Sequence, residues 1–135
     1  MQKPKIGFIG LGLMGSAMVE RLQSLGYELR VKGNRSRQKI EEAVSRGAVE
    51  SVSAKQMAEQ VEIVMFCVDN SQSVESNIYG EAGLLLGVKA GTIVIDFGTS
   101  LPSSTLKIAK DLSAKGAFYL DCPLGRTPAH ATDGK

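Results

Sequence analysis

Short apolar runs alternate along this chain with longer stretches in which apolar residues recur every three or four positions. In the first such stretch Met14, Met18 and Leu22 fall on one face, which is the spacing of an α-helix. Gly26 and Gly47 each follow an amphipathic stretch and are placed to stop a helix. The pattern predicts strands at residues 5–9, 28–32, 48–52, 61–68, 92–96 and 117–121, and helices at residues 14–25, 37–46, 53–60 (with Ser53 as N-cap), 71–79 and 102–115.

This regular alternation predicts an α/β fold with a mostly parallel sheet. Strands joined by helices of about ten residues must cross over one face of the sheet, so helices come to cover both faces. The predicted strands are nearly continuous apolar runs, which is typical of strands buried on both sides. We therefore expect a Rossmann-type, doubly wound parallel sheet that forms one domain over residues 1–135, in which residues 127–135 have no clear period.

Composition narrows the class of protein. Of the 135 residues, 43% are hydrophobic and 22% charged, which is usual for a soluble globular protein. A net charge of +2 argues against a nucleic-acid partner, and no apolar run approaches the ~20 residues that cross a membrane. Cys67 and Cys122 lie in apolar runs interpreted as strands, so we expect neither a disulfide framework nor a metal site. Without a signal-peptide pattern, a cytoplasmic location is expected.

A glycine-rich turn joins the first strand to the first helix. The run Gly10-Leu11-Gly12-Leu13-Met14-Gly15 matches the Gly-x-Gly-x-x-Gly fingerprint in the strand–turn–helix context that makes it specific. In that fingerprint Gly10 permits the tight turn, Gly12 lets the backbone approach a diphosphate, and Gly15 allows close packing of helix on strand. The N–H groups at the helix N-terminus would face the diphosphate. An ordinary strand-to-helix loop is the alternative interpretation.

The end of the second strand indicates which dinucleotide binds. NAD-binding versions carry a carboxylate there, about 20 residues past the glycines, for the adenosine ribose. Residues 31–37 contain no Asp or Glu, and Asn34, Arg35 and Ser36 offer a guanidinium and hydrogen-bonding groups instead. We therefore expect NADP(H), with NAD(H) the weaker candidate. A solvated basic turn is the alternative, and Arg37 and Lys39 are also compatible with a surface helix.

Several motifs in succession resemble one enzyme family over essentially the whole chain. Residues 6–15, reading IGFIGLGLMG, are similar to the opening of the β-hydroxyacid dehydrogenases, which include 3-hydroxyisobutyrate, tartronate semialdehyde and 6-phosphogluconate enzymes. Residues 34–36 are similar to the Asn-Arg-Thr of NADP-preferring members. The resemblance continues through residues 80–84, 94–99 and 120–124. It implies reversible hydride transfer between NADP(H) and a small β-hydroxyacid or its semialdehyde.

Three departures from the family pattern bear on the site. Val68-Asp69 replaces the usual Leu-Pro, and Gly98-Thr99 replaces Ser-Thr, at strand ends where Val68 and Thr99 would meet the nicotinamide-side ribose. Gly125-Arg126-Thr127 replaces the common Ser-Gly-Gly substrate loop and resembles the Gly-Arg-Thr of sulfolactaldehyde reductases. The resemblance implies that this loop binds the anion of a small substrate, for which a planar guanidinium is suited. An exposed loop arginine is the equally weighted alternative.

The family's general acid has no counterpart in this sequence. It is a lysine in a second, helical domain, so no residue here is predicted to be catalytic, and we expect further strands and that domain beyond residue 135. His130 is interpreted as a surface histidine. The expected partner is a small anionic molecule, and a homo-oligomer is compatible with the resemblance. A non-catalytic nucleotide-binding module is the rival hypothesis. An S-adenosylmethionine-dependent methyltransferase ranks last because its usual acid after the second strand is missing.

Overall fold

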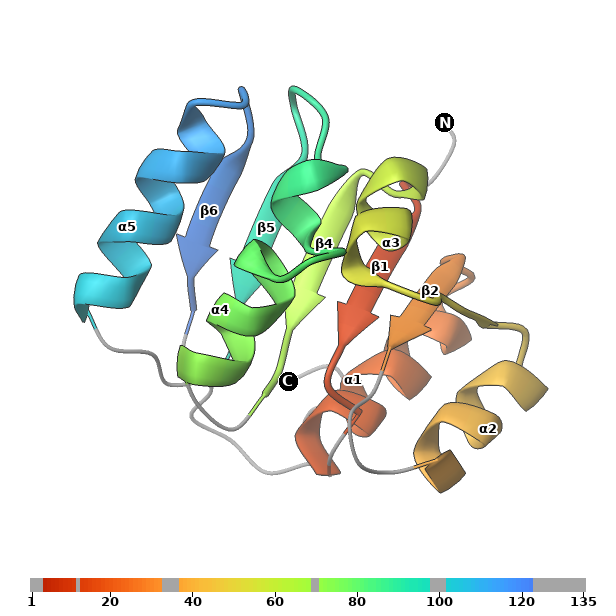
Figure 1. Cartoon of the computed structure of the whole chain (residues 1–135). Coiled ribbons are helices and arrows are strands. Elements are labelled where there is room, and N and C mark those ends of the chain that lie inside the picture. Colours follow the sequence, from red (N-terminus) through yellow and green to blue (C-terminus); the bar gives the residue numbers. More distant parts are fainter. Residues whose placement is uncertain (1–3, 12, 33–36, 69–70, 98–101, 123–135) are drawn as a thin grey trace.

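The chain folds into a six-stranded sheet flanked by helices (Figure 1). The structure is a computed structural model, and it describes residues 4–11, 13–32, 37–68, 71–97 and 102–122. The strands are β1 (Ile6–Ile9), β2 (Leu29–Lys32), β3 (Val49–Glu50), β4 (Ile63–Phe66), β5 (Ile93–Asp96) and β6 (Phe118–Asp121). The helices are α1 (Leu13–Ser24), α2 (Arg37–Ser45), α3 (Ala54–Gln60), α4 (Ser71–Tyr79), α5 (Pro102–Ser113) and the 3-10 helix η1 (Leu84–Leu86).

The strand order is β3-β2-β1-β4-β5-β6, and every neighbouring pair is parallel. The chain builds outward from β1 in one direction, then crosses over and builds outward from β4 in the other. Helices α3, α4 and α5 cover one face of the sheet, while α1 and α2 cover the other (Figure 1). This arrangement confirms the predicted Rossmann-type, doubly wound fold.

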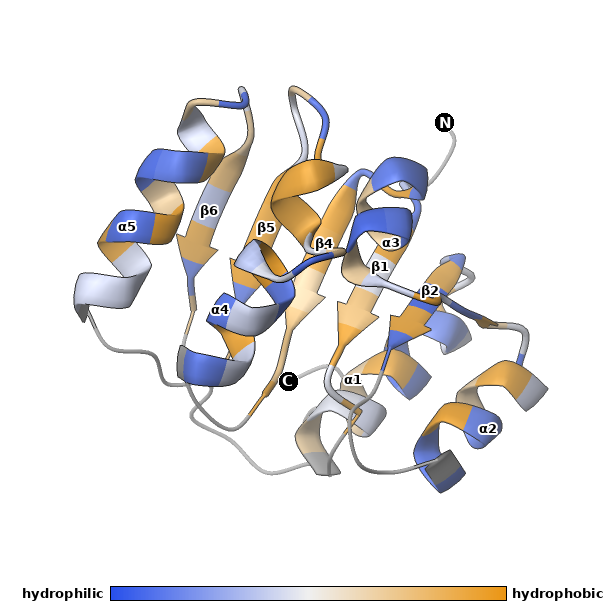
Figure 2. Ribbon diagram, in the orientation of Figure 1, coloured by the Kyte–Doolittle hydropathy of each residue, from blue (hydrophilic) through white to orange (hydrophobic). Residues whose placement is uncertain are grey.

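Two apolar cores hold the helices to the sheet. The larger core includes Val64, Phe66 and Val94 from the central strands, with Ile78 of α4 and Ile108 of α5 packed against them. The smaller core joins strands β1 and β2 to α1 and α2. Burying large apolar side chains is worth about 1.5–3 kcal/mol each, so these two layers account for most of the favourable free energy. Figure 2 shows hydrophobic residues concentrated in the strands, and helices that carry both hydrophobic and hydrophilic residues.

The structure confirms three residues that were predicted to mark the ends of helices. Gly26 and Gly47 follow α1 and α2 with φ of 90° and 109°, a region that favours glycine over residues with a Cβ. Ser53 caps α3 by accepting a hydrogen bond of 3.1 Å from the Gln56 backbone N–H. Among the described residues, no helix is both long and apolar enough to cross a lipid bilayer.

Other details differ from the predictions. Cys67 and Cys122 do not lie in strands, because β4 ends at Phe66 and β6 at Asp121, although both backbone N–H groups still donate to the neighbouring strand. The strand expected at residues 61–68 is shorter because Val61 serves as the C-cap of α3. Helix η1 was not predicted, since a single 3-10 turn is too short to show a period.

Candidate functional site

The order of the strands identifies the carboxyl ends of β1 and β4 as the expected ligand-binding position. Strands β1 and β4 are neighbours, but the chain leaves them in opposite directions, to β2 and to β5. In doubly wound sheets the connections then separate above the carboxyl ends of these two strands, and ligands bind in the resulting crevice. The residues that follow β1 and β4 are therefore the first to consider.

Gly10, directly after β1, makes a turn that only glycine accommodates well. Its φ is 99°, and a Cβ at this position would overlap the Cys67 carbonyl oxygen and lie 2.7 Å from Cγ1 of Val68. Its N–H donates a hydrogen bond of 2.9 Å to the carbonyl oxygen of Lys32, at the end of β2. The turn is thus fastened to β2 on one side and packed against the end of β4 on the other.

Gly15 brings helix α1 against the exit of β1. A Cβ at Gly15 would overlap the Gly10 carbonyl oxygen and lie 3.2 Å from the ring of Phe8. Any larger residue would push the N-terminal turn of α1 away from the strand. Leu11 is 3% exposed and belongs to the smaller core, whereas Met14 is half-buried. Leu13 is the first residue of α1, and Gly12 lies outside the described residues.

Among the sequence-predicted positions that the structure describes, Gly10 lies against both Gly15 and Val68. The half-buried Val68 packs on the larger core and closes the β4 side of the glycine turn. The remaining predicted positions fall outside the described residues. They are Asn34, Arg35, Ser36, Thr99, Gly125, Arg126 and Thr127.

A contact that sequence reasoning missed lies beside the turn. Lys32, the last residue of β2, donates a hydrogen bond of 3.0 Å from Nζ to Oδ1 of Asn77 on α4. Asn77 is 7% exposed, and its Nδ2 donates to the Ser73 carbonyl oxygen at 2.8 Å. Burial lowers the pKa of the Lys32 ammonium from its ordinary value. The sequence offered two signals for this contact: a lysine at the end of an apolar strand, and an asparagine three residues after Val74.

Polar contacts hold the carboxyl ends of β5 and the flanking helices in place. The Tyr119 hydroxyl donates to Oδ2 of the fully buried Asp96 at 3.1 Å, which joins β6 to the end of β5. Burial and the neighbouring carboxylate raise the pKa of Tyr119. Helices α4 and α5 are linked by Ser104 donating to Glu75 at 2.8 Å. These contacts fix the strand end from which residues 98–101 continue.

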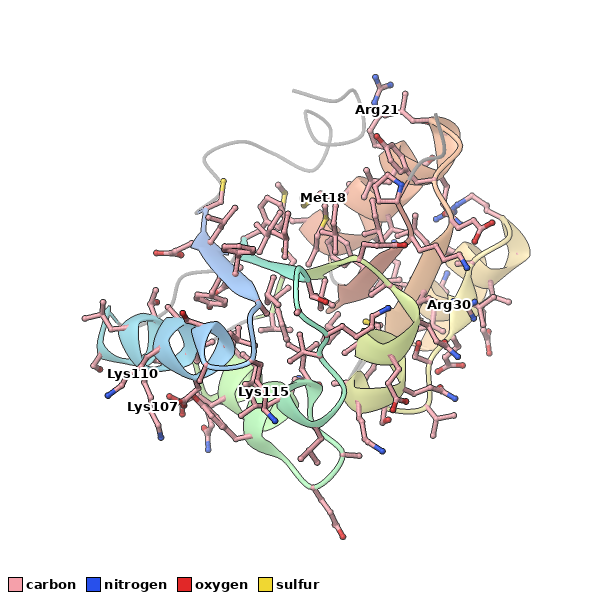
Figure 3. All side chains as sticks on the ribbon, turned by 90° about the horizontal axis from the view of Figure 1, so that it is seen from above. Met18, Arg21, Arg30, Lys107, Lys110 and Lys115 are labelled. Carbon is pink, nitrogen blue, oxygen red and sulfur yellow. The ribbon has the colours of Figure 1, made fainter. Side chains whose placement is uncertain are left out.

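A second α4–α5 link lies farther along the two helices. The Tyr79 hydroxyl donates to Oδ2 of Asp111 at 2.5 Å, and the ammonium of Lys107 sits 4.9 Å from the centre of the Tyr79 ring. Figure 3 labels Lys107 on α5. Burial and the Asp111 carboxylate raise the pKa of Tyr79. Within the described ranges, no group of three His, Cys, Asp or Glu residues could hold a metal ion.

The curated proteins that this chain is similar to include named oxidoreductases. It is 36% identical over 129 residues to 3-sulfolactaldehyde reductase of Escherichia coli, covering 96% of this chain and 43% of that protein. It is 32% identical over 133 residues to a probable mitochondrial 3-hydroxyisobutyrate dehydrogenase-like protein of Arabidopsis thaliana, covering 98% and 44%. The chain therefore spans less than half the length of these relatives.

The structural and family comparisons agree with this placement. The solved structure of Psf3 in complex with NADP+ and 2-OPP superposes with a TM-score of 0.88 at 29% identity, covering 96% of this chain and 45% of that one. The family model for the NAD binding domain of 6-phosphogluconate dehydrogenase matches residues 5–135. A pyridine-nucleotide-binding domain is therefore supported by both sequence and fold. The chain belongs to the family of the NAD binding domain of 6-phosphogluconate dehydrogenase.

Proposed function

We propose that this chain is the NADP(H)-binding part of an oxidoreductase that transfers hydride between NADP(H) and a small β-hydroxyacid or its semialdehyde. The observation that carries the proposal is the turn at Gly10. Gly10 has a φ of 99°, donates a hydrogen bond to Lys32 and packs against Val68. Because it is a glycine, no side chain covers the backbone at the place where the connections from β1 and β4 separate. Such a turn at a helix N-terminus suits a diphosphate.

The cofactor would lie along the carboxyl edge of the sheet. The run Gly10-Leu11-Gly12-Leu13-Met14-Gly15 would hold the diphosphate, and Val68 and Thr99 would meet the nicotinamide-side ribose. Asn34, Arg35 and Ser36 would bind the adenosine 2′-phosphate. Support comes from the sequence, in which these three residues follow shortly after Lys32, the last residue of β2, and in which no acid stands between Leu29 and Arg37.

The substrate would be a small anion bound by Gly125, Arg126 and Thr127. A guanidinium can form two parallel hydrogen bonds with a carboxylate or a sulfonate, which favours Arg126 as the anchor. The similarity to 3-sulfolactaldehyde reductase supports a sulfonated or carboxylated substrate. Neither Cys67 nor Cys122 forms a disulfide, which suits a reducing compartment, and we propose the cytoplasm.

Calorimetric titration of the 135-residue chain with NADPH, NADH and S-adenosylmethionine tests the proposed class of ligand. Both dinucleotides should bind and S-adenosylmethionine should not. Gly12→Val would place two methyl groups beside the diphosphate and should abolish dinucleotide binding. Ala114→Val, at an exposed position after α5, is the matched control and should bind as the unaltered chain does. Binding of S-adenosylmethionine alone, or normal NADPH binding by Gly12→Val, would contradict the proposal.

A further inference from the structure

The side chain of Lys32 faces the side of the sheet that α3 and α4 cover. Along β2, Leu29 and Val31 are buried in the core formed with α1 and α2. Because successive side chains in a strand point to opposite faces, Arg30 and Lys32 face the side covered by α3 and α4. The hydrogen bond from Lys32 to Asn77 of α4 agrees with this direction. Figure 3 shows the labelled Arg30 between the ribbons of β2 and α3.

Lys32 is also joined directly to the phosphate-binding turn. Its backbone carbonyl accepts the hydrogen bond from the Gly10 N–H, and its Cα pairs with Ile9 of β1. The residue therefore stands beside the first glycine of the turn and immediately before the segment proposed to hold the adenosine phosphate. Among the described residues, no other lysine lies both beside Gly10 and just before that segment.

Asn77 fixes the position of the Lys32 ammonium. The side-chain amide of Asn77 donates to the Ser73 carbonyl oxygen, so its Oδ1 is the atom left to accept from Lys32. Asn77 is buried in α4 and cannot swing away without losing both bonds. A lysine side chain, usually mobile in solvent, is thus held in one place.

The charge on Lys32 has no balancing anion among the described residues. The ammonium carries three donors, and in the described part of the chain only the neutral Asn77 amide accepts from it. Partial burial removes some of its hydration, which disfavours the charged form. A half-buried cation of this kind gains most from a bound anion, because the attraction between charges is stronger where water is excluded.

We propose that Lys32, positioned by Asn77, is a further specificity-determining residue, whose ammonium binds the phosphate on the adenosine ribose of NADP(H). The inference rests on the proposed function, because it requires the adenosine half of the dinucleotide to lie over the end of β2. It adds to Arg35 a second cation, which comes from the last residue of β2, and it makes Asn77 a positioning residue for cofactor choice.

The test compares NADPH and NADH affinities by calorimetric titration. Lys32→Met removes the charge and keeps most of the side-chain volume. NADPH affinity should fall about tenfold or more, as for loss of one charged hydrogen bond, while NADH affinity changes less than about twofold. Lys110→Met, at an exposed position on α5, is the matched control and should leave both affinities unchanged. Lys32→Arg should retain most of the preference for NADPH.

A second variant separates the role of charge from a merely structural one. Asn77→Asp keeps the shape of the side chain but places a carboxylate against Lys32, which then competes with the phosphate for the ammonium. It also removes the donor to the Ser73 carbonyl oxygen, and a purely structural effect of that loss would lower NADPH and NADH affinity equally. The variant should lower NADPH affinity selectively, and the loss should shrink as salt is added. An equal fall in NADPH and NADH affinity, or an unchanged ratio in both variants, would overturn the inference while leaving the proposed function intact. Failure of the unaltered chain to bind either dinucleotide would overturn both.

Discussion

The hydroxyl of Tyr119 on β6 donates a hydrogen bond of 3.1 Å to the fully buried carboxylate of Asp96 on β5. The two residues stand on strands whose pairing places Asp96 opposite Asp121. The bond ties the edge strand of the sheet to the strand that leads into residues 98–101. It satisfies part of the hydrogen-bonding capacity of a carboxylate that water cannot reach.

Tyr119→Phe should destabilise the chain by removing that donor. A buried polar group that loses a partner costs about 1–3 kcal/mol, and we expect a loss in this range in the free energy of unfolding measured with urea. Tyr79→Phe removes the analogous bond to Asp111 at a more exposed place between α4 and α5, and should cost less. A Tyr119→Phe variant as stable as the unaltered chain would show that the bond contributes nothing.

The same pair predicts a dependence of stability on alkaline pH. Burial and Asp96 raise the pKa of Tyr119, so the folded state keeps its proton where the unfolded chain, with a phenol pKa of about 10, loses it. The contribution of Tyr119 is therefore complete below about pH 10 and is lost as the pH rises toward the folded-state pKa. In urea unfolding between pH 8 and 11, the gap between the unaltered chain and Tyr119→Phe should narrow by up to ~1 kcal/mol. A gap that stays constant across this range would count against the raised pKa.

Gly10→Ala should be much more damaging than an alanine at another glycine of positive φ. At Gly10 the added methyl meets the Cys67 carbonyl oxygen and Val68, whereas Gly47, with φ of 109°, has open space around it. Both variants incur the left-handed backbone cost of about 1–2 kcal/mol, but only Gly10→Ala adds the collision. Urea unfolding should give a clearly larger loss for Gly10→Ala. Equal losses would mean that the turn can move aside.

The isolated chain should bind cofactor without turning over substrate. Hydride transfer to a carbonyl leaves a developing alkoxide, and a positioned general acid contributes about 10²–10⁴-fold by protonating it. No residue here is predicted to be that acid. NADPH oxidation, followed by absorbance, should stay at background with sulfolactaldehyde or tartronate semialdehyde. Robust turnover that Arg126→Ala abolishes would contradict this and would point to His130 as a missed acid.

The sequence was sufficient for the fold because its signals were local and repeated. Ser53, Gly26 and Gly47 mark helix ends through chemistry that acts within a few residues, and the structure confirms all three. The parallel sheet followed from the alternation of strand and helix. The contacts between distant elements did not follow, because a single sequence carries no sign of which side chains meet across the sheet.

Lys32 illustrates what was missing from the prediction of the site. The sequence places it at the end of a strand, but only the packing of α4 brings Asn77 within 3.0 Å of its ammonium. The pairing of Tyr119 with Asp96 was equally invisible, since 23 positions separate the two residues in the chain. The tight turn at Gly10 and the close packing at Gly15, by contrast, were predictable because both belong to one fingerprint of six consecutive residues.

The preference for NADPH over NADH tests the account most directly. Calorimetric titration of the chain with each dinucleotide should give tighter binding of NADPH, and Arg35→Ala should reduce that preference about tenfold to a hundredfold, as for loss of one charged contact. Arg46→Ala, at an exposed arginine just past the far end of α2, is the matched control and should leave the preference unchanged. Equal affinity of the unaltered chain for the two dinucleotides would contradict the proposed cofactor and the roles given to both Arg35 and Lys32.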